Sequence, residues 1–206
     1  MTARTRVKLD EHTRLPAVAA AVGAALTRHR IRAVLTGGAC ATIYTRGQYQ
    51  SHDMDFIVVR TTTQAQLDTA LASIGFVRTR DRYIHPGLPF YVEFPRGPLA
   101  IGDDYRIRPV RRRVGSTQVL MLSATDSCRD RLAAFYHWND RQSLDVALGI
   151  ALAQRVSVAV IRRWSLAEGF PERFEEFLDE LRRARGRRRV SARVSATRWP
   201  RRRGFV

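Results

Sequence analysis

Two aspartates and a glutamate are the residues of this chain whose types and spacing most clearly predict chemistry. Asp53 and Asp55 begin the apolar run DMDFIVV, and Glu93 interrupts a second apolar run, PFYVEFP. Side chains at positions i and i+2 of a strand point to the same side, so both aspartates are expected to face one spot. Clustered carboxylates suit Mg²⁺, and two-metal phosphoryl transfer uses a further acid. We predict that Asp53, Asp55 and Glu93 are catalytic and hold two Mg²⁺ ions, although Glu93 also fits an ordinary solvent-facing strand position.

A pair of glycines precedes these acids. Gly37 and Gly38 separate the short apolar run 31–36 from a stretch that can start a helix. Glycine has no Cβ, so backbone N–H groups can approach a phosphate there, and a helix N-terminus attracts the same anion. We predict that both glycines bind the phosphates of a nucleoside triphosphate (NTP), with Ser51 and Arg46 as further nucleotide contacts. Ser51 also fits a loop serine that satisfies its own backbone, and Arg46 fits a solvated loop arginine.

Together, the run Leu35-Thr36-Gly37-Gly38, the motif Asp53-Met54-Asp55 and the later Glu93 resemble the DNA polymerase β-type nucleotidyltransferase superfamily. The sub-pattern Gly-Gly-Ala-x-Ala … Arg-Gly … Ser-x-Asp-x-Asp is most similar to the AbiEii and MenT branch, the toxin nucleotidyltransferases of bacterial toxin–antitoxin systems. Over about residues 31–122 the resemblance implies a short mixed β-sheet backed by helices. It also implies an enzyme that moves a nucleoside monophosphate (NMP) from an NTP to RNA at the 3′ end of tRNA, and that an antitoxin protein or kinase silences.

The same branch uses a lysine early in a downstream helix and an aspartate further on. This chain has no lysine there, so the resemblance assigns that place to Arg129 or Arg131 and the acid to Asp140 or Asp145. Arginine keeps the positive charge and can contact a phosphate. Its planar guanidinium, however, presents N–H donors in a fixed arrangement, whereas the lysine ammonium is a compact point charge. All four are predicted nucleotide-binding residues. The alternative is a structural role, such as pairing of Asp145 with Arg141 one helical turn away.

Hydrophobic periodicity predicts the elements that position these residues. Helices are predicted over 11–30, 39–44 and 64–74, and strands over 31–36, 53–59, 76–83, 90–94, 106–110 and 118–122. From Ser123, which with Asp126 forms a helix-capping pattern, the sequence is helical to about residue 183, with a break near 169–171. The order predicts an α+β chain with three parts: a nucleotidyltransferase core (1–122), a helical subdomain (123–183) and a basic, disordered tail (184–206).

The charge and composition of the chain indicate which classes of partner it can bind. The chain has 36 basic and 19 acidic residues and a formal net charge of +17, and residues 182–206 alone hold 11 arginines and no acid. A field of that sign attracts polyanions, so we predict RNA as a partner, although such a tail can also be merely solvated. Cys40 and Cys128 are the only cysteines, which fits a reducing cytoplasmic location. The apolar run 16–26 is too short for a membrane span, so no membrane partner is predicted.

Two other functions remain open from the sequence. The first is NMP transfer to a small molecule or a protein hydroxyl. Acceptor sites for aminoglycosides are acid-rich, and the arginine surplus of this chain argues against one. The second is an inactive nucleotidyltransferase-fold module that acts as a binding partner or antitoxin, against which the complete set of Asp53, Asp55 and Glu93 argues.

Overall fold

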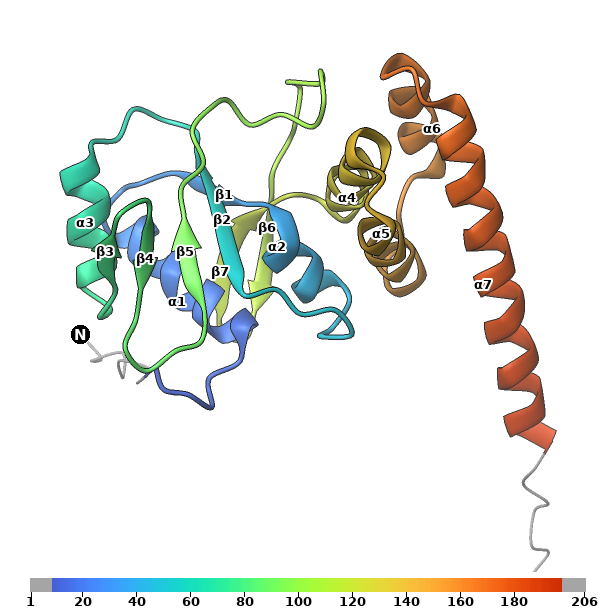
Figure 1. Ribbon diagram of the computed structural model, residues 1–206. Coiled ribbons are helices and arrows are strands. Elements are labelled where there is room, and N and C mark those ends of the chain that lie inside the picture. Colours follow the sequence, from blue (N-terminus) through green and yellow to red (C-terminus); the bar gives the residue numbers. More distant parts are fainter. Residues whose placement is uncertain (1–8, 198–206) are drawn as a thin grey trace, which may run out of the picture.

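A seven-stranded mixed sheet forms the body of the protein and confirms the predicted α+β class in this computed structural model, which describes residues 9–197 (Figure 1). The strands lie in the order β3-β4-β5-β2-β1-β7-β6. They are β1 Ala33–Leu35, β2 Asp53–Val58, β3 Val77–Thr79, β4 Arg82–Ile84, β5 Tyr91–Glu93, β6 Val110–Val114 and β7 Thr117–Met121. The helices are α1 Leu15–Arg28, α2 Gly37–Tyr44, α3 Gln64–Ala72, α4 Ala124–Trp138, α5 Arg141–Ala153, α6 Val158–Ala167 and α7 Pro171–Thr197.

The centre of the sheet is built from short strands of apolar residues. β1 pairs antiparallel with β2 and parallel with β7, and β2 pairs parallel with β5. Met54, Phe56 and Val92 are fully or almost fully buried and belong to a core that also contains the buried side of α1. α1 packs against β7 and α3, and its stripe of buried residues, including Val18 and Val22, has the period of an amphipathic helix. This packing leaves the alternate residues of β2 and β5 on the opposite face.

Two predicted strands differ from those observed. The run 76–83, expected as one strand, is a hairpin in which β3 and β4 pair antiparallel around a turn containing Arg80 at φ +59°. The predicted strand 106–110 was also wrong in position, because the strand is β6, which pairs with β7 across a turn at Gly115. Arginine-rich β6 carries too few apolar residues for periodicity to reveal it, and pairing with β7 stabilises it instead.

The C-terminal part is helical, as predicted. Ser123 caps α4 by accepting a hydrogen bond from the Asp126 backbone (3.1 Å), and α7 begins at Pro171, after the predicted break. The expected disordered tail needs correction, because α7 continues to Thr197; arginine and alanine, frequent in this stretch, favour helix. The rest of the predicted tail, 198–206, lies outside the described residues. Within residues 9–197, no helix has both the length and the apolarity to cross a membrane.

Candidate active site

Three carboxylates lie on one face of the sheet where β2 and β5 run side by side. The parallel register places Asp53 opposite Tyr91 and Asp55 opposite Glu93, and paired residues of neighbouring strands point to the same side. The intervening Met54 points to the other side, where it is completely buried in the core. The structure therefore brings together the three acids that the sequence predicts as catalytic.

The Asp55 carboxyl group has a raised pKa. Burial, together with the negative charges of Asp53 and Glu93, raises its pKa from 3.8 to about 6. Asp130 acts in the same direction, whereas Arg131 opposes the shift. Such a group favours either a proton or a cation at its oxygen atoms.

The perturbed Asp55 predicts how stability depends on pH. Without divalent metal, the folded chain binds a proton near pH 6, whereas the unfolded chain binds it near 3.8. The free energy of unfolding should therefore rise by about 1–2 kcal/mol as pH falls from above 7 to about 4, relative to an Asp55→Asn variant without this titration. Urea unfolding in EDTA between pH 4 and 8 measures the difference. Parallel pH profiles for the two proteins would contradict the assignment.

The glycine pair leaves the space in which two of the polar side chains sit. Gly37 begins α2 at φ +63°, and a Cβ there would collide with the Asp55 carboxylate. A Cβ at Gly38 would collide with the hydroxyl of Ser51, which donates a hydrogen bond to Asp53. Ser51 is buried, and its backbone N–H donates to Thr42 Oγ1 (3.2 Å). The glycines thus keep the start of α2 close against the carboxylates, and Ser51 orients one of them.

Replacing Gly37 tests this close approach. Gly37→Ala should lower nucleotide transfer by about tenfold or more, because the new Cβ displaces the Asp55 carboxylate. Gly115→Ala is the matched control, since Gly115 has a similar φ of +59° but open space around it. Both variants should lose a similar amount of stability, about 1 kcal/mol. Equal activity of the two in a transfer assay would show that the contact with Asp55 is unimportant.

Helix α4 adds a basic and an acidic side chain next to the acids. Arg131 donates from Nε and Nη2 to Asp130 (3.0 and 2.8 Å), and its charge acts on both Asp55 and Tyr49. The sequence prediction for Arg131 is therefore compatible with the structure, whereas Asp130 was missed. Asp130 carried no signal of its own, since sequence alone does not tell which helix positions face the sheet.

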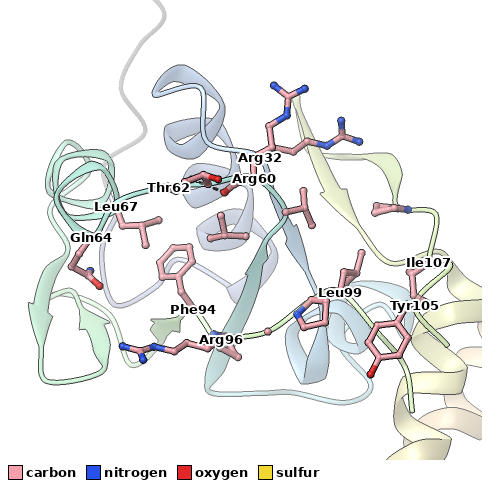
Figure 2. Close-up of a pocket in the computed structure, with 17 residues that line it drawn as sticks. Arg32, Arg60, Thr62, Gln64, Leu67, Phe94, Arg96, Leu99, Tyr105 and Ile107 are labelled. Carbon is pink, nitrogen blue, oxygen red and sulfur yellow. Dashed lines mark hydrogen bonds between the residues drawn. The ribbon is translucent and has the colours of Figure 1, made fainter. Parts of the chain in front are cut away.

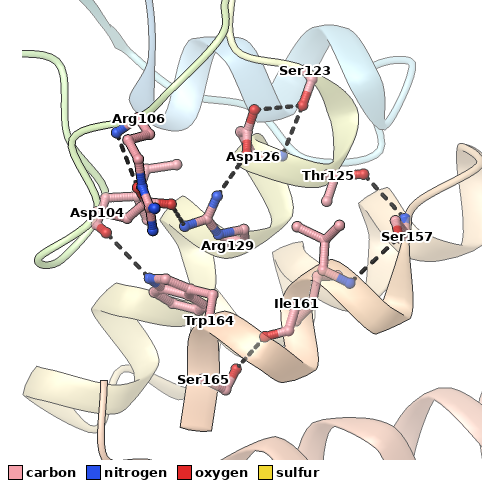
Figure 3. A network of polar contacts seen from close by, with 12 residues as sticks. Asp104, Arg106, Ser123, Thr125, Asp126, Arg129, Ser157, Ile161, Trp164 and Ser165 are labelled. Atoms are coloured by element: carbon pink, nitrogen blue, oxygen red, sulfur yellow. Dashed lines mark hydrogen bonds and ion pairs between the residues drawn. The ribbon is translucent and has the colours of Figure 1, made fainter. Parts of the chain in front are cut away.

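Two of the other predicted nucleotide contacts, Arg129 and Asp140, have structural roles. Arg129 needs correction, because it is buried and its guanidinium bonds Asp104 (2.6 Å) and Asp126 (2.9 Å) while lying over the Trp164 ring (Figure 3). It is a structural residue.

Asp140 is also structural, since it caps α5 by accepting hydrogen bonds from the Ser143 backbone N–H (3.2 Å) and hydroxyl (2.7 Å). Asp145 is exposed on α5, and its suggested partner Arg141 bonds Glu176 of α7 instead. Arg46 lies exposed in the turn after α2 at φ +56°. Asp140 thus has a structural role, whereas the predicted nucleotide contacts of Asp145 and Arg46 stay predictions.

The carboxylate face continues over β5 onto β4, which the sequence prediction missed. Ile84 pairs with Tyr91, and Arg82 pairs with Glu93, so these side chains extend the row that begins at Asp53. The Arg82 guanidinium lies over the Tyr91 ring, 4.8 Å from its centroid, and Ile84 is 43% exposed. An aromatic ring, a cation and an exposed apolar side chain thus lie next to the acids, and only the strand register reveals it.

The donor set at this face fits Mg²⁺. Within residues 9–197, no group of three or more His, Cys, Asp or Glu side chains is arranged as a metal site. Asp53 instead bonds Ser51, while the backbone register holds Asp55 next to Glu93. Side chains directly across neighbouring strands are about 5 Å apart at Cβ, so rotation of the carboxylates can bring their oxygens onto one ion. The raised pKa of Asp55 shows that positive charge would be favoured here.

The sequence matches no protein-family model and no curated protein. Among solved structures, the fold is similar to an antigenic nucleotidyltransferase-like protein from Paracoccidioides brasiliensis, with a TM-score of 0.49 and 16% identity over 69% of this chain and 76% of that one. It is also similar to the antibiotic-resistance factor ANT(2'')-Ia, with a TM-score of 0.45 and 12% identity over 88% of this chain and 96% of that one. Both TM-scores lie below 0.5, so these likenesses are too loose to assign a function.

Proposed function

We propose that this protein is a Mg²⁺-dependent nucleotidyltransferase that moves an NMP from an NTP to RNA. The observation that carries the proposal is the register that sets Asp55 beside Glu93 and Asp53 on the same face, with Gly37 against Asp55. Carboxylates that repel one another next to a glycine-bounded helix start are suited to bind a cation and a phosphate together.

In the proposed reaction, the acceptor hydroxyl attacks the α-phosphorus of the NTP. A phosphorus–oxygen bond forms to the acceptor, the bond between the α-phosphorus and the bridging oxygen breaks, and pyrophosphate leaves with that oxygen. Glu93 receives the hydroxyl proton. Asp53 and Asp55 would hold Mg²⁺, which would neutralise phosphate charge. The start of α2 positions the triphosphate and Arg131 contacts it, so catalysis comes mainly from positioning and charge.

RNA is the proposed acceptor because of the surface next to the acids and the charge of the chain. Tyr91 and Ile84 offer faces on which an unpaired base can stack, and Arg82 adds a cation at the same place. The net charge of +17 favours a polyanion over a small cationic acceptor. Exposed arginines of α7, such as Arg185 and Arg187, can supply phosphate contacts that carry no sequence information. By resemblance, the site of transfer is the 3′ end of tRNA.

A toxin role is the biological part of the proposal. Its support is the sub-pattern around Gly37-Gly38 and Asp53-Met54-Asp55, which resembles toxin nucleotidyltransferases. An enzyme that modifies tRNA ends stops translation, so a neutralising antitoxin protein or kinase is the expected partner. Expression in a bacterial host should arrest growth, and the Asp55→Asn variant should not.

The proposal is tested by incubating the protein with Mg²⁺, total RNA, a protein extract and each α-labelled NTP in turn. Label that moves to tRNA supports the proposal. Label on protein or on an added small molecule would redirect it to that acceptor. No transfer with any NTP, together with intact binding of RNA, would show a non-catalytic binding module.

A further inference from the structure

A pocket of about 870 Å³ opens at the end of β2 and β5 that lies beyond the carboxylates (Figure 2). The pocket is lined by Val58, Val59 and Arg60 at the end of β2 and by Phe94, Pro95 and Arg96 after β5. The loop 97–109 completes the wall. Its volume lies within the range of small-molecule sites, about 300–1,000 Å³.

The pocket is separate from the proposed active site. Val58 is three residues beyond Asp55 along β2, which is about 10 Å along the strand. Phe94 follows Glu93 directly, so the two side chains point to opposite faces of the sheet. The Phe94 ring packs against Phe56 (6.2 Å between centroids) on the α1 side of the sheet. A ligand here would not touch the carboxylates.

All charged side chains that line the pocket are positively charged. Arg32, Arg60 and Arg96 line it, and no acidic residue does. All three arginines are exposed, and none of them forms an ion pair within the described part of the chain. In contrast, buried Arg129 bonds two aspartates. The charge of the pocket rim is therefore uncompensated and available for an anion.

Between these arginines the surface is apolar and partly aromatic. Leu67 and Phe94 lie on one side and Leu99 and Ile107 on the other, as Figure 2 shows. Tyr105 is 63% exposed, so its ring is accessible to a ligand. Apolar and aromatic surface beside arginines suits a ligand that has both a flat ring and a phosphate.

The loop that forms the outer wall is held in place by the helical part. Arg129 of α4 bonds Asp104 (2.6 Å), and Trp164 of α6 donates from Nε1 to the Ile101 carbonyl (3.2 Å) (Figure 3). The carboxylate of Glu168 accepts from the Asp103 backbone (2.8 Å). These contacts flank Tyr105 and fix its backbone, so the pocket is a built feature of the fold.

We infer that this pocket binds a nucleotide unit, with one phosphate on Arg60, a neighbouring phosphate on Arg96 at the opposite side of the pocket, and its base against Tyr105. The nucleotide comes from an RNA strand that crosses the protein or is free in solution; both sources present the same phosphate and ring. The site is additional to the proposed NTP site and does not depend on catalysis.

The test measures binding of a fluorescent single-stranded RNA decamer to the full chain by anisotropy, without NTP. Arg60→Ala combined with Arg96→Ala should weaken binding by about tenfold and lower the slope of log K against log salt by about 1.4, or 0.7 per lost phosphate contact. The matched control is Arg162→Ala with Arg163→Ala, which removes the same charge from two exposed positions of α6 and should change binding less than about twofold. Equal weakening by both pairs would overturn the inference in favour of diffuse attraction.

Separate experiments test the base contact and the source of the nucleotide. Tyr105→Ala should weaken binding of the RNA decamer by about fivefold or more and leave binding of an abasic decamer unchanged. Displacement of the decamer by free AMP, lost in the arginine double variant, assigns the pocket to a free nucleotide; binding of RNA alone assigns it to a strand. Equal displacement by a polyglutamate peptide would overturn the nucleotide inference. Asp55→Asn should lose transfer while its binding of the decamer stays sensitive to the Arg60 and Arg96 substitutions, so loss of transfer and loss of this site are distinguishable.

Discussion

Asp55→Asn is expected to reduce transfer of NMP to RNA by at least about 10³-fold. The Asp55 carboxylate lies between Asp53 and Glu93 on the proposed metal-binding face, and its pKa of about 6 leaves it ionised at neutral pH. An amide of the same shape cannot supply the negative charge that a divalent cation needs. Measurement of initial rates with labelled NTP, Mg²⁺ and tRNA gives the ratio directly.

The same variant should be as stable as the wild type or more stable at pH 7.5 in EDTA. Burial and repulsion from the neighbouring carboxylates disfavour the negative charge of Asp55. Removing that charge should therefore raise the free energy of unfolding or leave it unchanged. Glu175→Gln of α7 is the matched control, because Glu175 is an exposed acid far along the chain from the carboxylate face; it should keep full activity. A wild-type rate for Asp55→Asn, or unfolding of the variant, would refute the assigned role.

The core of the candidate site could be predicted from the sequence because local rules determine it. The alternation of a strand places Asp53 and Asp55 on one side whatever the strand pairs with, and a glycine pair between a strand and a helix predicts a tight turn. Glu93 needed one further condition, that its strand lies beside β2 in this register. The resemblance to a known superfamily supplied that condition, which periodicity alone does not contain.

The rest of the surroundings depends on packing that the sequence does not specify. Arg129 and Arg131 are two residues apart on α4 and therefore point to different sides of the helix; the rotation of α4 against the sheet decides which one is buried with Asp104. The place of Tyr91 and Arg82 beside the acids follows from the β4–β5–β2 register. Asp140 was misread because a helix-capping aspartate and a ligand aspartate have the same local sequence signal.

Arg129→Met is expected to lower the free energy of unfolding by about 3 kcal/mol. The Arg129 side chain is 4% exposed and bonds the carboxylates of Asp104 and Asp126, whose side chains are only 22% and 13% exposed. Methionine fills similar volume but leaves both acids without their cation, and the contact with the Trp164 ring loses its charge. Chemical denaturation at pH 7 measures the loss. A change below about 0.5 kcal/mol would show that the network contributes no more than a surface ion pair.

The cost of Arg129→Met comes mostly from the two acids that it leaves unpaired, and this can be separated from the cost of losing the arginine itself. Adding Asp104→Asn and Asp126→Asn to Arg129→Met removes those charges, so the triple variant should recover most of the lost stability. The loop around Asp104 should nevertheless stay looser in both variants, since the bond that fixed it is gone. Hydrogen exchange at residues 101–106 should therefore rise in the single and the triple variant alike, and binding of the RNA decamer at the Arg60 and Arg96 pocket should weaken in both, even where global stability is restored.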